Sequence, residues 1–344
     1  MTNGAARPLA LTLGEPGGIG PEITAKAWRT LRAGPQSEKP ANRMADWPTF
    51  CLVGDLALMA AHGPAQAISS PLEAASVFPS AIPVIDCVDA RRARPGTASP
   101  ETAPAVIASI ERAVALALSG EAAGVVTNPI QKSALQAAGF GFPGHTEFLG
   151  ELTAGAPMPA GRTRGPVMML AGPGLRTVPV TIHLSVADAA RTLDAERIVH
   201  VASVAAEELG ARFGIARPRL AVSGLNPHAG EDGRMGGEDG DVIAPAVARL
   251  RAAGIDAIGP MPADTMFHAA ARAGYDAAIC MLHDQALIPV KTLAFDEAVN
   301  VTLGLPIVRT SPDHGTALDI AGKGVASPAS LIAALRLAAR MATP

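Results

Sequence analysis

Residues 276–324, DAAICMLHDQALIPVKTLAFDEAVNVTLGLPIVRTSPDHGTALDIAGKG, contain the pattern that decides the fold. The apolar run 277–282 predicts a buried strand, and it stops at His283. An imidazole that can bind a metal ion is therefore expected at the carboxyl end of a strand. The stretch closes on the turn 313–324, which is too rich in glycine and charge to serve packing alone. In open α/β sheets, ligands bind just outside such strand ends.

The rest of the chain alternates between two kinds of segment. Apolar runs such as 9–13 and 219–222 predict strands, whereas 104–119 and 327–341 predict amphipathic helices. This alternation indicates an α/β protein with a largely parallel sheet. The turn 14–22 is either a cradle for the phosphates of a cofactor or a tight turn, and it does not match the GxGxxG fingerprint.

Composition narrows the class of protein. A length of 344 residues suggests two domains or one large α/β unit. With 49% apolar and 17% charged residues, the chain has the composition of a globular protein with a substantial core. A net charge of −3 and only 3% aromatic residues argue against a nucleic-acid partner and against binding to an anionic membrane.

Cysteine usage and the N-terminus bear on the compartment. Cys51, Cys87 and Cys280 are far apart and form no CxxC pair, which favours free thiols in a reducing compartment. The N-terminal residues include no long apolar segment of the kind found in signal peptides, and no run approaches the roughly 18 apolar residues of a membrane helix. We therefore expect a cytoplasmic protein that does not insert into a membrane.

Three of the eight histidines share one kind of position. His183, His228 and His283 each come at or just after the carboxyl end of a predicted strand. Three imidazoles can hold a divalent metal ion and leave coordination positions open for a substrate. A single histidine is more often structural, so this prediction depends on the equivalence of the three positions.

Several further groups are able to hold an anion. Lys291, Asn300 and Arg309 are spaced along one apolar segment, and an arginine can grip a phosphate or carboxylate with two hydrogen bonds. His145 and Thr146 open a predicted helix, where they either bind an anion or form an ordinary cap.

The last turn has the residues of a dinucleotide site. Asp313, His314 and Gly315 are followed closely by Asp319. A histidine can lie against an adenine, and a carboxylate can accept hydrogen bonds from a ribose diol. Because an acid at that diol disfavours a 2′-phosphate, the turn predicts NAD, with NADP as the alternative.

These motifs together resemble those of the 4-hydroxythreonine-4-phosphate dehydrogenase (PdxA) family of vitamin B6 synthesis. The matching segments run in order over nearly the whole chain: 13–22, 127–130, 143–148, 224–231, 262–265, 283–285 and 309–317. The turn 313–324 also looks like the nucleotide loop of isocitrate and isopropylmalate dehydrogenases, which share the fold. Asp232 and Ala286 stand where glycine is more usual in the family.

The resemblance implies an architecture. It implies two α/β/α domains with a central, mostly parallel sheet, as in isocitrate and isopropylmalate dehydrogenases. The expected division is a nucleotide-side domain of residues 1–145 plus 300–344 and a metal and dimerisation domain of residues 146–299. It also implies a homodimer in which the two subunits share the active site.

The resemblance also assigns roles. His183, His228 and His283 are implied as the ligands of one divalent metal ion per subunit, which is Zn, Mg or Co. The implied substrate contacts are His145, Thr146, Lys291, Asn300 and Arg309. Lys291 and Asp264 are candidates for catalytic proton transfer, and the general base is not assigned. The nucleotide contacts expected from the turn are Asp313, His314, Gly315 and Asp319.

The implied reaction is a dehydrogenation of a small phosphorylated substrate. NAD(P) oxidises 4-phosphooxy-L-threonine to a 3-oxo acid, which loses CO2 to give 3-amino-2-oxopropyl phosphate for pyridoxal 5′-phosphate synthesis. Within the family, the alternatives are the oxidation of D-threonate or D-erythronate 4-phosphate or of a cyclic cis-diol dicarboxylate. A solute-binding module and a regulatory NAD-binding protein are the non-catalytic alternatives.

Overall fold

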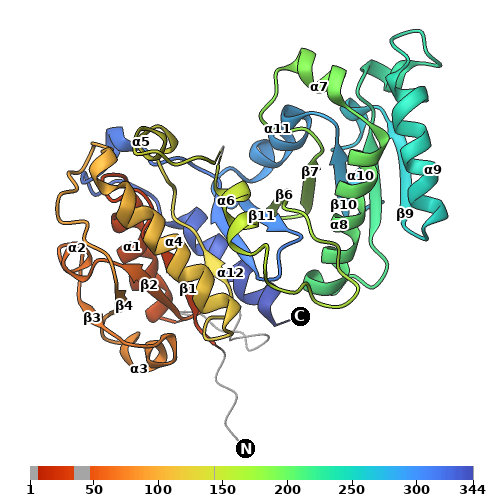
Figure 1. Ribbon diagram of the computed structural model, residues 1–344. Helices are drawn as coiled ribbons and strands as arrows, with labels where there is room; N and C mark the ends of the chain where they lie inside the picture. Colours follow the sequence, from red (N-terminus) through yellow and green to blue (C-terminus); the bar gives the residue numbers. More distant parts are fainter. Residues whose placement is uncertain (1–6, 35–46, 143, 344) are drawn as a thin grey trace, which may run out of the picture. The chain divides into compact units, whose positions relative to one another are not determined.

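The computed structural model describes residues 7–34, 47–142 and 144–343 of the chain (Figure 1). Pro143 of the motif at 143–148 lies outside the described residues. The chain divides into two compact units, with residues 1–157 and 305–343 in unit 1 and residues 158–304 in unit 2. The functional division expected at residues 145 and 300 stays a prediction.

Unit 1 has a parallel sheet with the strand order β3-β4-β2-β1-β5-β12. All residues of β1 and β2 are buried, so both faces of the sheet are covered. Strands buried on both faces read as continuous apolar runs, which is the pattern that the sequence has here. The strands are β1 (Leu9–Thr12), β2 (Phe50–Gly54), β3 (Ala65–Ala67), β4 (Ile82–Asp86), β5 (Val125–Val126) and β12 (Arg309–Pro312).

Helices cover this sheet. The helices of unit 1 are α1 (Gly20–Arg32), α2 (Leu56–Ala60), α3 (Ala74–Val77), α4 (Ala103–Leu118), α5 (Lys132–Ala137), α6 (His145–Leu152) and α12 (Ala329–Ala342). Helix α4 buries Val106 and Ile110 in one core cluster with Ala10 and Val53 of the strands. Helix α12 contacts α1, β1, β5 and β12, so the C-terminal segment completes the unit that the N-terminal segment begins (Figure 1).

Unit 2 has a mixed sheet with the strand order β11-β6-β7-β10-β8-β9. Strands β7, β10, β8 and β9 are parallel neighbours, whereas β6 pairs antiparallel with both β7 and β11. The strands are β6 (Val167–Gly172), β7 (Leu175–Pro179), β8 (Arg219–Ser223), β9 (Asp256–Met261), β10 (Ala277–Cys280) and β11 (Val299–Leu303).

Two long helices pack on the strands of unit 2. Helix α11 contacts β6, β7 and β10, and it shares a core cluster with them that includes Leu170, Ala278 and Val290. Helix α8 contacts β6, β7, β8 and β11. The helices are α7 (Val186–Thr192), α8 (Ala195–Phe213), α9 (Ala244–Ala252), α10 (Ala269–Arg272) and α11 (His283–Ala294).

The predicted α/β class with a mostly parallel sheet is confirmed. Strand β6 runs antiparallel to both of its neighbours, β7 and β11, and the sequence patterns could not predict its direction, because an apolar run does not encode the direction of its neighbour. In the part of the chain that the structure describes, no helix is both long and apolar enough to cross a membrane.

The turn between β1 and α1 is packed against backbone. A Cβ atom added at Gly17 would lie 2.0 Å from the carbonyl oxygen of Thr97, and one added at Gly18 would lie 2.8 Å from that of Thr316. These glycines therefore permit close approach between loops. Of the two interpretations of residues 14–22, the structure favours the tight turn over the phosphate cradle.

One buried hydroxyl joins this turn to the helices. Ser109 of α4 accepts a hydrogen bond from the backbone N–H of Leu13 (2.8 Å) and donates one to the carbonyl of Val53 (2.7 Å). The side chain is fully buried, so neither backbone group has access to water as a substitute.

Ser109→Ala should therefore lower the free energy of unfolding of unit 1 by about 1–3 kcal/mol, the usual cost of unsatisfied buried polar groups. Both tryptophans, Trp28 and Trp47, belong to unit 1, so denaturant unfolding followed by tryptophan fluorescence reports this unit. Ser76→Ala is the matched control, because Ser76 bonds the carbonyl of Glu73 at an exposed position. An equal loss in both variants would contradict the assigned role of Ser109.

Candidate functional site

The carboxyl ends of three parallel neighbours, β7, β10 and β8, meet at one edge of the sheet of unit 2. His183 follows β7, His283 begins α11 directly after β10, and His228 follows β8. The strand order therefore gives the three histidines equivalent topological positions, as the sequence predicted. Ligands bind at this kind of edge in open α/β sheets.

Two of these histidines lie side by side. The ring centroids of His183 and His283 are 6.4 Å apart, and the ring planes are inclined by 40°. Two hydrogen bonds beyond the strands bring their segments together. The backbone N–H of Val180 donates to the carbonyl of Cys280 (2.8 Å), and the side-chain hydroxyl of Thr181 donates to the carbonyl of Met281 (2.6 Å).

A carboxylate fixes the tautomer of His283. Nδ1 of His283 lies 2.8 Å from Oδ1 of Asp284, and because a carboxylate accepts, Nδ1 carries the hydrogen. The lone pair of the ring then lies on Nε2. Metal-binding histidines commonly donate their second ring nitrogen to a carboxylate in this way.

His228 lies in a segment with unusual backbone. His228 (φ 54°), Ala229 (φ 52°) and Glu231 (φ 42°) all occupy the left-handed region, as does Asp232 (φ 56°). This region is sparsely populated by residues other than glycine, and strain of this kind collects at functional sites. Asp232 stands where the resemblance implies glycine, and its positive φ is a conformation that glycine adopts more readily than other residues.

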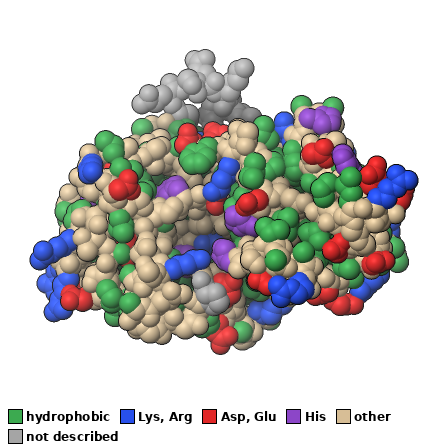
Figure 2. All heavy atoms as spheres, turned by 90° about the horizontal axis from the view of Figure 1, so that it is seen from above, with side chains coloured by type: hydrophobic (Ala, Val, Ile, Leu, Met, Phe, Trp, Pro, Cys, Tyr) green, Lys and Arg blue, Asp and Glu red, His purple; other side chains and the backbone are tan. Residues whose placement is uncertain are grey.

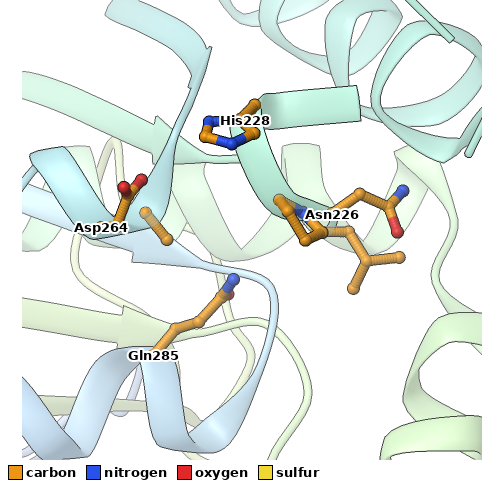
Figure 3. Close-up of a pocket in the computed structure, with 7 residues that line it drawn as sticks. Asn226, His228, Asp264 and Gln285 are labelled. Atoms are coloured by element: carbon orange, nitrogen blue, oxygen red, sulfur yellow. The ribbon is translucent and has the colours of Figure 1, made fainter. Parts of the chain in front are cut away.

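Beside this segment is a cavity of about 410 Å³ (Figure 3). Its lining residues are Leu225, Asn226, Pro227, His228, Ala263, Asp264 and Gln285. In Figure 3, Asp264, His228 and Gln285 come from three different parts of the chain and surround one space. The predicted catalytic candidate Asp264 thus lines the same cavity as one predicted metal ligand.

The donors of unit 2 suit a divalent metal ion in their chemistry. Imidazoles are ligands of Zn and related ions, and His283 has the tautomer that leaves Nε2 as the donor. Within residues 7–34, 47–142 and 144–343, however, no group of three or more His, Cys, Asp or Glu side chains is arranged to hold a metal ion. The structure therefore brings His183 and His283 together and leaves His228 on the neighbouring cavity.

Two of the predicted substrate contacts, Lys291 and Asn300, belong to unit 2. Lys291 is in α11 and is half-buried. Asn300 is in β11, and its Oδ1 atom is buried without a hydrogen-bond partner. A buried amide oxygen without a partner is unusual in a protein interior and marks a place where a ligand could donate a hydrogen bond.

Unit 1 contains a buried cation. Arg309 of β12 is 3% exposed, and its Nη2 donates to the hydroxyl of Thr127 at the end of β5 (2.7 Å). Burial lowers the pKa of the Arg309 guanidinium to about 10, which still leaves it charged at neutral pH. A buried cation favours the approach of an anion, because the anion offsets the cost of burial.

More basic groups surround Arg309. His145 is the first residue of α6, and burial together with the positive charges of Arg309 and Lys132 lowers its pKa well below the usual value. The buried Nε2 of His145 has no hydrogen-bond partner. Lys132 lies close by, since a Cβ atom added at Gly144 would come within 3.4 Å of its Nζ.

The sequence analysis placed His145 and Arg309 among the anion-binding groups and missed Lys132. Lys132 opens α5, and no local pattern links it to His145 or Arg309. Thr146, the other predicted group, is the second residue of α6, where backbone N–H groups can also bind an anion.

The predicted dinucleotide turn is held by contacts within unit 1. Nδ1 of His314 lies 3.0 Å from the carbonyl of Gly315 and must donate to it, and the buried Nε2 has no partner. The hydroxyl of Thr316 donates to Gln131 (2.8 Å). Asp319 is exposed, as a carboxylate that meets a ribose must be.

Helix α1 supports the far end of this turn. Glu22 accepts hydrogen bonds from the N–H groups of Gly324 (3.3 Å) and Ala326 (3.0 Å), and Lys26 donates to both carbonyls. Hydrogen bonds from Lys26 and from these N–H groups keep the pKa of Glu22 below its ordinary value despite its burial. The motif at 13–22 therefore reaches the nucleotide turn through a carboxylate that the sequence analysis did not single out.

The visible surface has no large patch of one charge. Figure 2 shows basic and acidic side chains interspersed over this face, in keeping with the formal net charge of −3. The distribution lacks the basic stripe that marks a nucleic-acid-binding face.

Comparison with known proteins gives a consistent result. The model of the family described as pyridoxal phosphate biosynthetic protein PdxA matches residues 46–338. A 4-hydroxythreonine-4-phosphate dehydrogenase of Bradyrhizobium diazoefficiens is 56% identical over 356 residues, which cover 99% of this chain and 99% of that protein. That name denotes an oxidoreductase.

Solved structures agree. A crystal structure of 4-hydroxythreonine-4-phosphate dehydrogenase from Klebsiella pneumoniae has a TM-score of 0.83 and 37% identity, covering 100% of both chains. A terephthalate 1,2-cis-dihydrodiol dehydrogenase from Burkholderia xenovorans has a TM-score of 0.63 and 30% identity over 98% of both chains.

The environment of His145 predicts a pH effect on stability. Its pKa in the folded state lies below the value near 6.5 expected when unfolded, so below pH 6.5 the unfolded state binds a proton that the folded state does not. Stability is lost as the pH falls, by about 1.4 kcal/mol per pH unit for one proton. His145→Gln should show a shallower loss between pH 7 and 5.5, measured by denaturant unfolding with tryptophan fluorescence. Identical pH slopes in the two proteins would contradict the burial of an uncharged His145.

Proposed function

The chain belongs to the family of pyridoxal phosphate biosynthetic protein PdxA, and from that premise we propose that it oxidises 4-phosphooxy-L-threonine with NAD. The observation that carries this proposal is the basic group around Arg309. A buried guanidinium, the start of α6 and a nearby lysine offer several donors to one dianion. A phosphate ester has the charge and the number of acceptor oxygens for such a set.

We assign the substrate contacts to His145, Thr146, Lys291, Asn300 and Arg309, as the family motifs imply. His145 is neutral at pH 7 because its pKa is lowered, so it can donate one hydrogen bond to a phosphate oxygen without adding charge. Arg309 supplies the fixed positive charge. Asn300 presents a buried amide oxygen that can accept from a substrate hydroxyl or amine.

A divalent metal ion, Zn, Mg or Co, would be held by His183, His228 and His283. When bound, it would act as a Lewis acid that lowers the pKa of the substrate hydroxyl. The pairing of His183 with His283 and the tautomer of His283 support this role.

The cofactor is proposed to bind at the turn 313–324. Nε2 of His314 is buried and has a lone pair that can accept from an adenine amino group. Asp313, Gly315 and the exposed Asp319 complete the set, with Asp319 on the ribose diol, which favours NAD over NADP.

The proposed chemistry has two steps. Oxidation of the secondary alcohol, with NAD as the hydride acceptor, gives 2-amino-3-oxo-4-phosphooxybutanoate and releases one proton. The bond between the carboxylate and C2 of this β-keto acid then breaks to release CO2, and C2 takes up one proton to give 3-amino-2-oxopropyl phosphate. Asp264, on the cavity with His228, and Lys291 are the candidates for accepting the hydroxyl proton.

We further propose a homodimer that shares its active site and works in the cytoplasm, where phosphorylated metabolites and NAD are present. Helix α11 and the residue after it expose Ile288 (60%), Leu293 (47%) and Phe295 (73%). Exposed apolar side chains that gather on one element suit burial against a second copy of the chain.

The proposal makes a prediction about activity. The purified protein should form NADH with 4-phosphooxy-L-threonine, and a chelator should remove the activity until Zn, Mg or Co is restored. D-threonate 4-phosphate, D-erythronate 4-phosphate and a cyclic cis-diol dicarboxylate should be tested in parallel. Faster turnover of a sugar-acid phosphate would show that this compound, and not 4-phosphooxy-L-threonine, is the substrate. Activity that survives chelation would contradict the proposed dependence on a metal ion.

The basic group makes a second prediction. Lys132→Met should raise KM for the substrate about tenfold, the factor that corresponds to about 1.4 kcal/mol of lost binding, and should change kcat little. Inhibition by inorganic phosphate should weaken by the same factor. Arg92→Met is the control, because Arg92 is an exposed cation of unit 1 whose ion pair with Glu101 is long, at 3.8 Å. Unchanged KM and unchanged phosphate inhibition in Lys132→Met would rule out a role in phosphate binding.

A further inference from the structure

Both the oxygen and the nitrogen of the Gln285 side-chain amide form hydrogen bonds. Its Oε1 accepts hydrogen bonds from the N–H of Leu282 (3.0 Å) and from the hydroxyl of Ser223 (3.2 Å). Its Nε2 donates to the carbonyl of Gly224 (2.9 Å). Because Oε1 accepts on one side and Nε2 donates on the other, exchanging the two atoms would break these hydrogen bonds. The amide group therefore has a single orientation.

These bonds join two segments that are distant in the sequence. Leu282 directly precedes His283 at the start of α11, and Gly224 opens the segment that leads from β8 to His228. Ser223 adds a further link, because its Oγ also accepts from the N–H of Met281 (3.3 Å). Figure 3 shows Gln285 rising from α11 toward the segment that carries Asn226 and His228.

A second anchor holds the same segment from the other side. The buried carboxylate of Asp239 accepts from the N–H groups of Leu225 (2.9 Å) and Asn226 (3.1 Å) and from the side chain of Asn226 (3.0 Å). The segment 224–226 is therefore fixed at successive residues just before the left-handed backbone of His228. The side chain of Gln285 connects this segment to the start of α11.

We propose that Gln285 is a positioning residue, which sets the distance between His228 and His283 and thereby the affinity of unit 2 for a divalent cation. The inference rests on the proposed function, which makes both histidines metal ligands. Residues that orient metal ligands typically change metal affinity by ten- to a hundredfold when they are replaced.

A simpler role is possible for one of these bonds, since the bond from Leu282 also satisfies an N–H group at the helix start. Helix capping alone would affect the stability of α11 and leave the ligand geometry unchanged. The two roles differ in what they predict for metal binding by folded protein.

The test is a Co²⁺ titration of the full-length protein, followed by calorimetry and by the visible absorption of the bound ion. Gln285→Met keeps the length of the side chain and removes all three hydrogen bonds. We expect Kd for Co²⁺ to rise ten- to a hundredfold, with a changed absorption band, in protein that circular dichroism shows to be folded. Thr177→Val is the matched control, because Thr177 donates a buried hydrogen bond to the carbonyl of Ala286 in the same helix (2.8 Å), and this bond does not involve the segment that leads to His228.

Ser223→Ala provides a smaller change that spares the fold, and it should raise Kd by two- to fivefold, less than Gln285→Met does. An unchanged Kd and absorption band in Gln285→Met, or an equal rise in Thr177→Val, would overturn the inference. If Gln285→Met does not fold, an unchanged Kd in Ser223→Ala would overturn it. Failure of the unaltered protein to bind Co²⁺ is a distinct result, which would remove the proposed metal site together with this inference.

Discussion

Because its strands are buried on both faces, this chain has its reactive side chains mainly at the ends of the strands. All residues of β1, β2 and β10 are buried, so each strand is a core element along its whole length. Polar and ionisable groups can then act only where strands end, since desolvation inside the sheet would be too costly. His183, His228 and His283 all follow this constraint, and so does Thr127, which accepts the hydrogen bond of Arg309.

Arg309 is placed differently, because it lies within β12 and is buried. Burial lowers the pKa of Arg309 to about 10. The burial of the neighbouring His145 lowers the pKa of that imidazole, and the positive charge of Arg309 lowers it further. A protein tolerates such a cation where an anion is bound during function. In the proposed phosphate site, the uncharged His145 would donate a hydrogen bond and the exposed Lys132 would add a positive charge.

In both units, hydrogen bonds from side chains hold the backbone of the loops that carry the proposed site residues. Glu22 and Lys26 hold the end of the nucleotide turn, while Gln285 and Asp239 hold the segment that leads to His228. In each case a side chain of a helix or of a helix start bonds the backbone of a loop. Loops are generally more mobile than helices and strands, and hydrogen bonds of this type fix the loop conformation that a binding site requires.

The sequence by itself determined the α/β class and most of the chemical groups. The apolar runs specify strands buried on both faces, and histidines at their ends are visible without any structure, as are Arg309 and the turn 313–324. Only the tertiary structure decided the strand order, the direction of β6 against both of its neighbours, and the partners of each group. The role proposed for Lys132 depends on the closeness of the starts of α5 and α6, and the role proposed for Gln285 depends on β8 and β10 being neighbours. The physical reason is that local patterns fix which face of a segment is apolar, whereas contacts between distant segments depend on how the chain returns to the sheet.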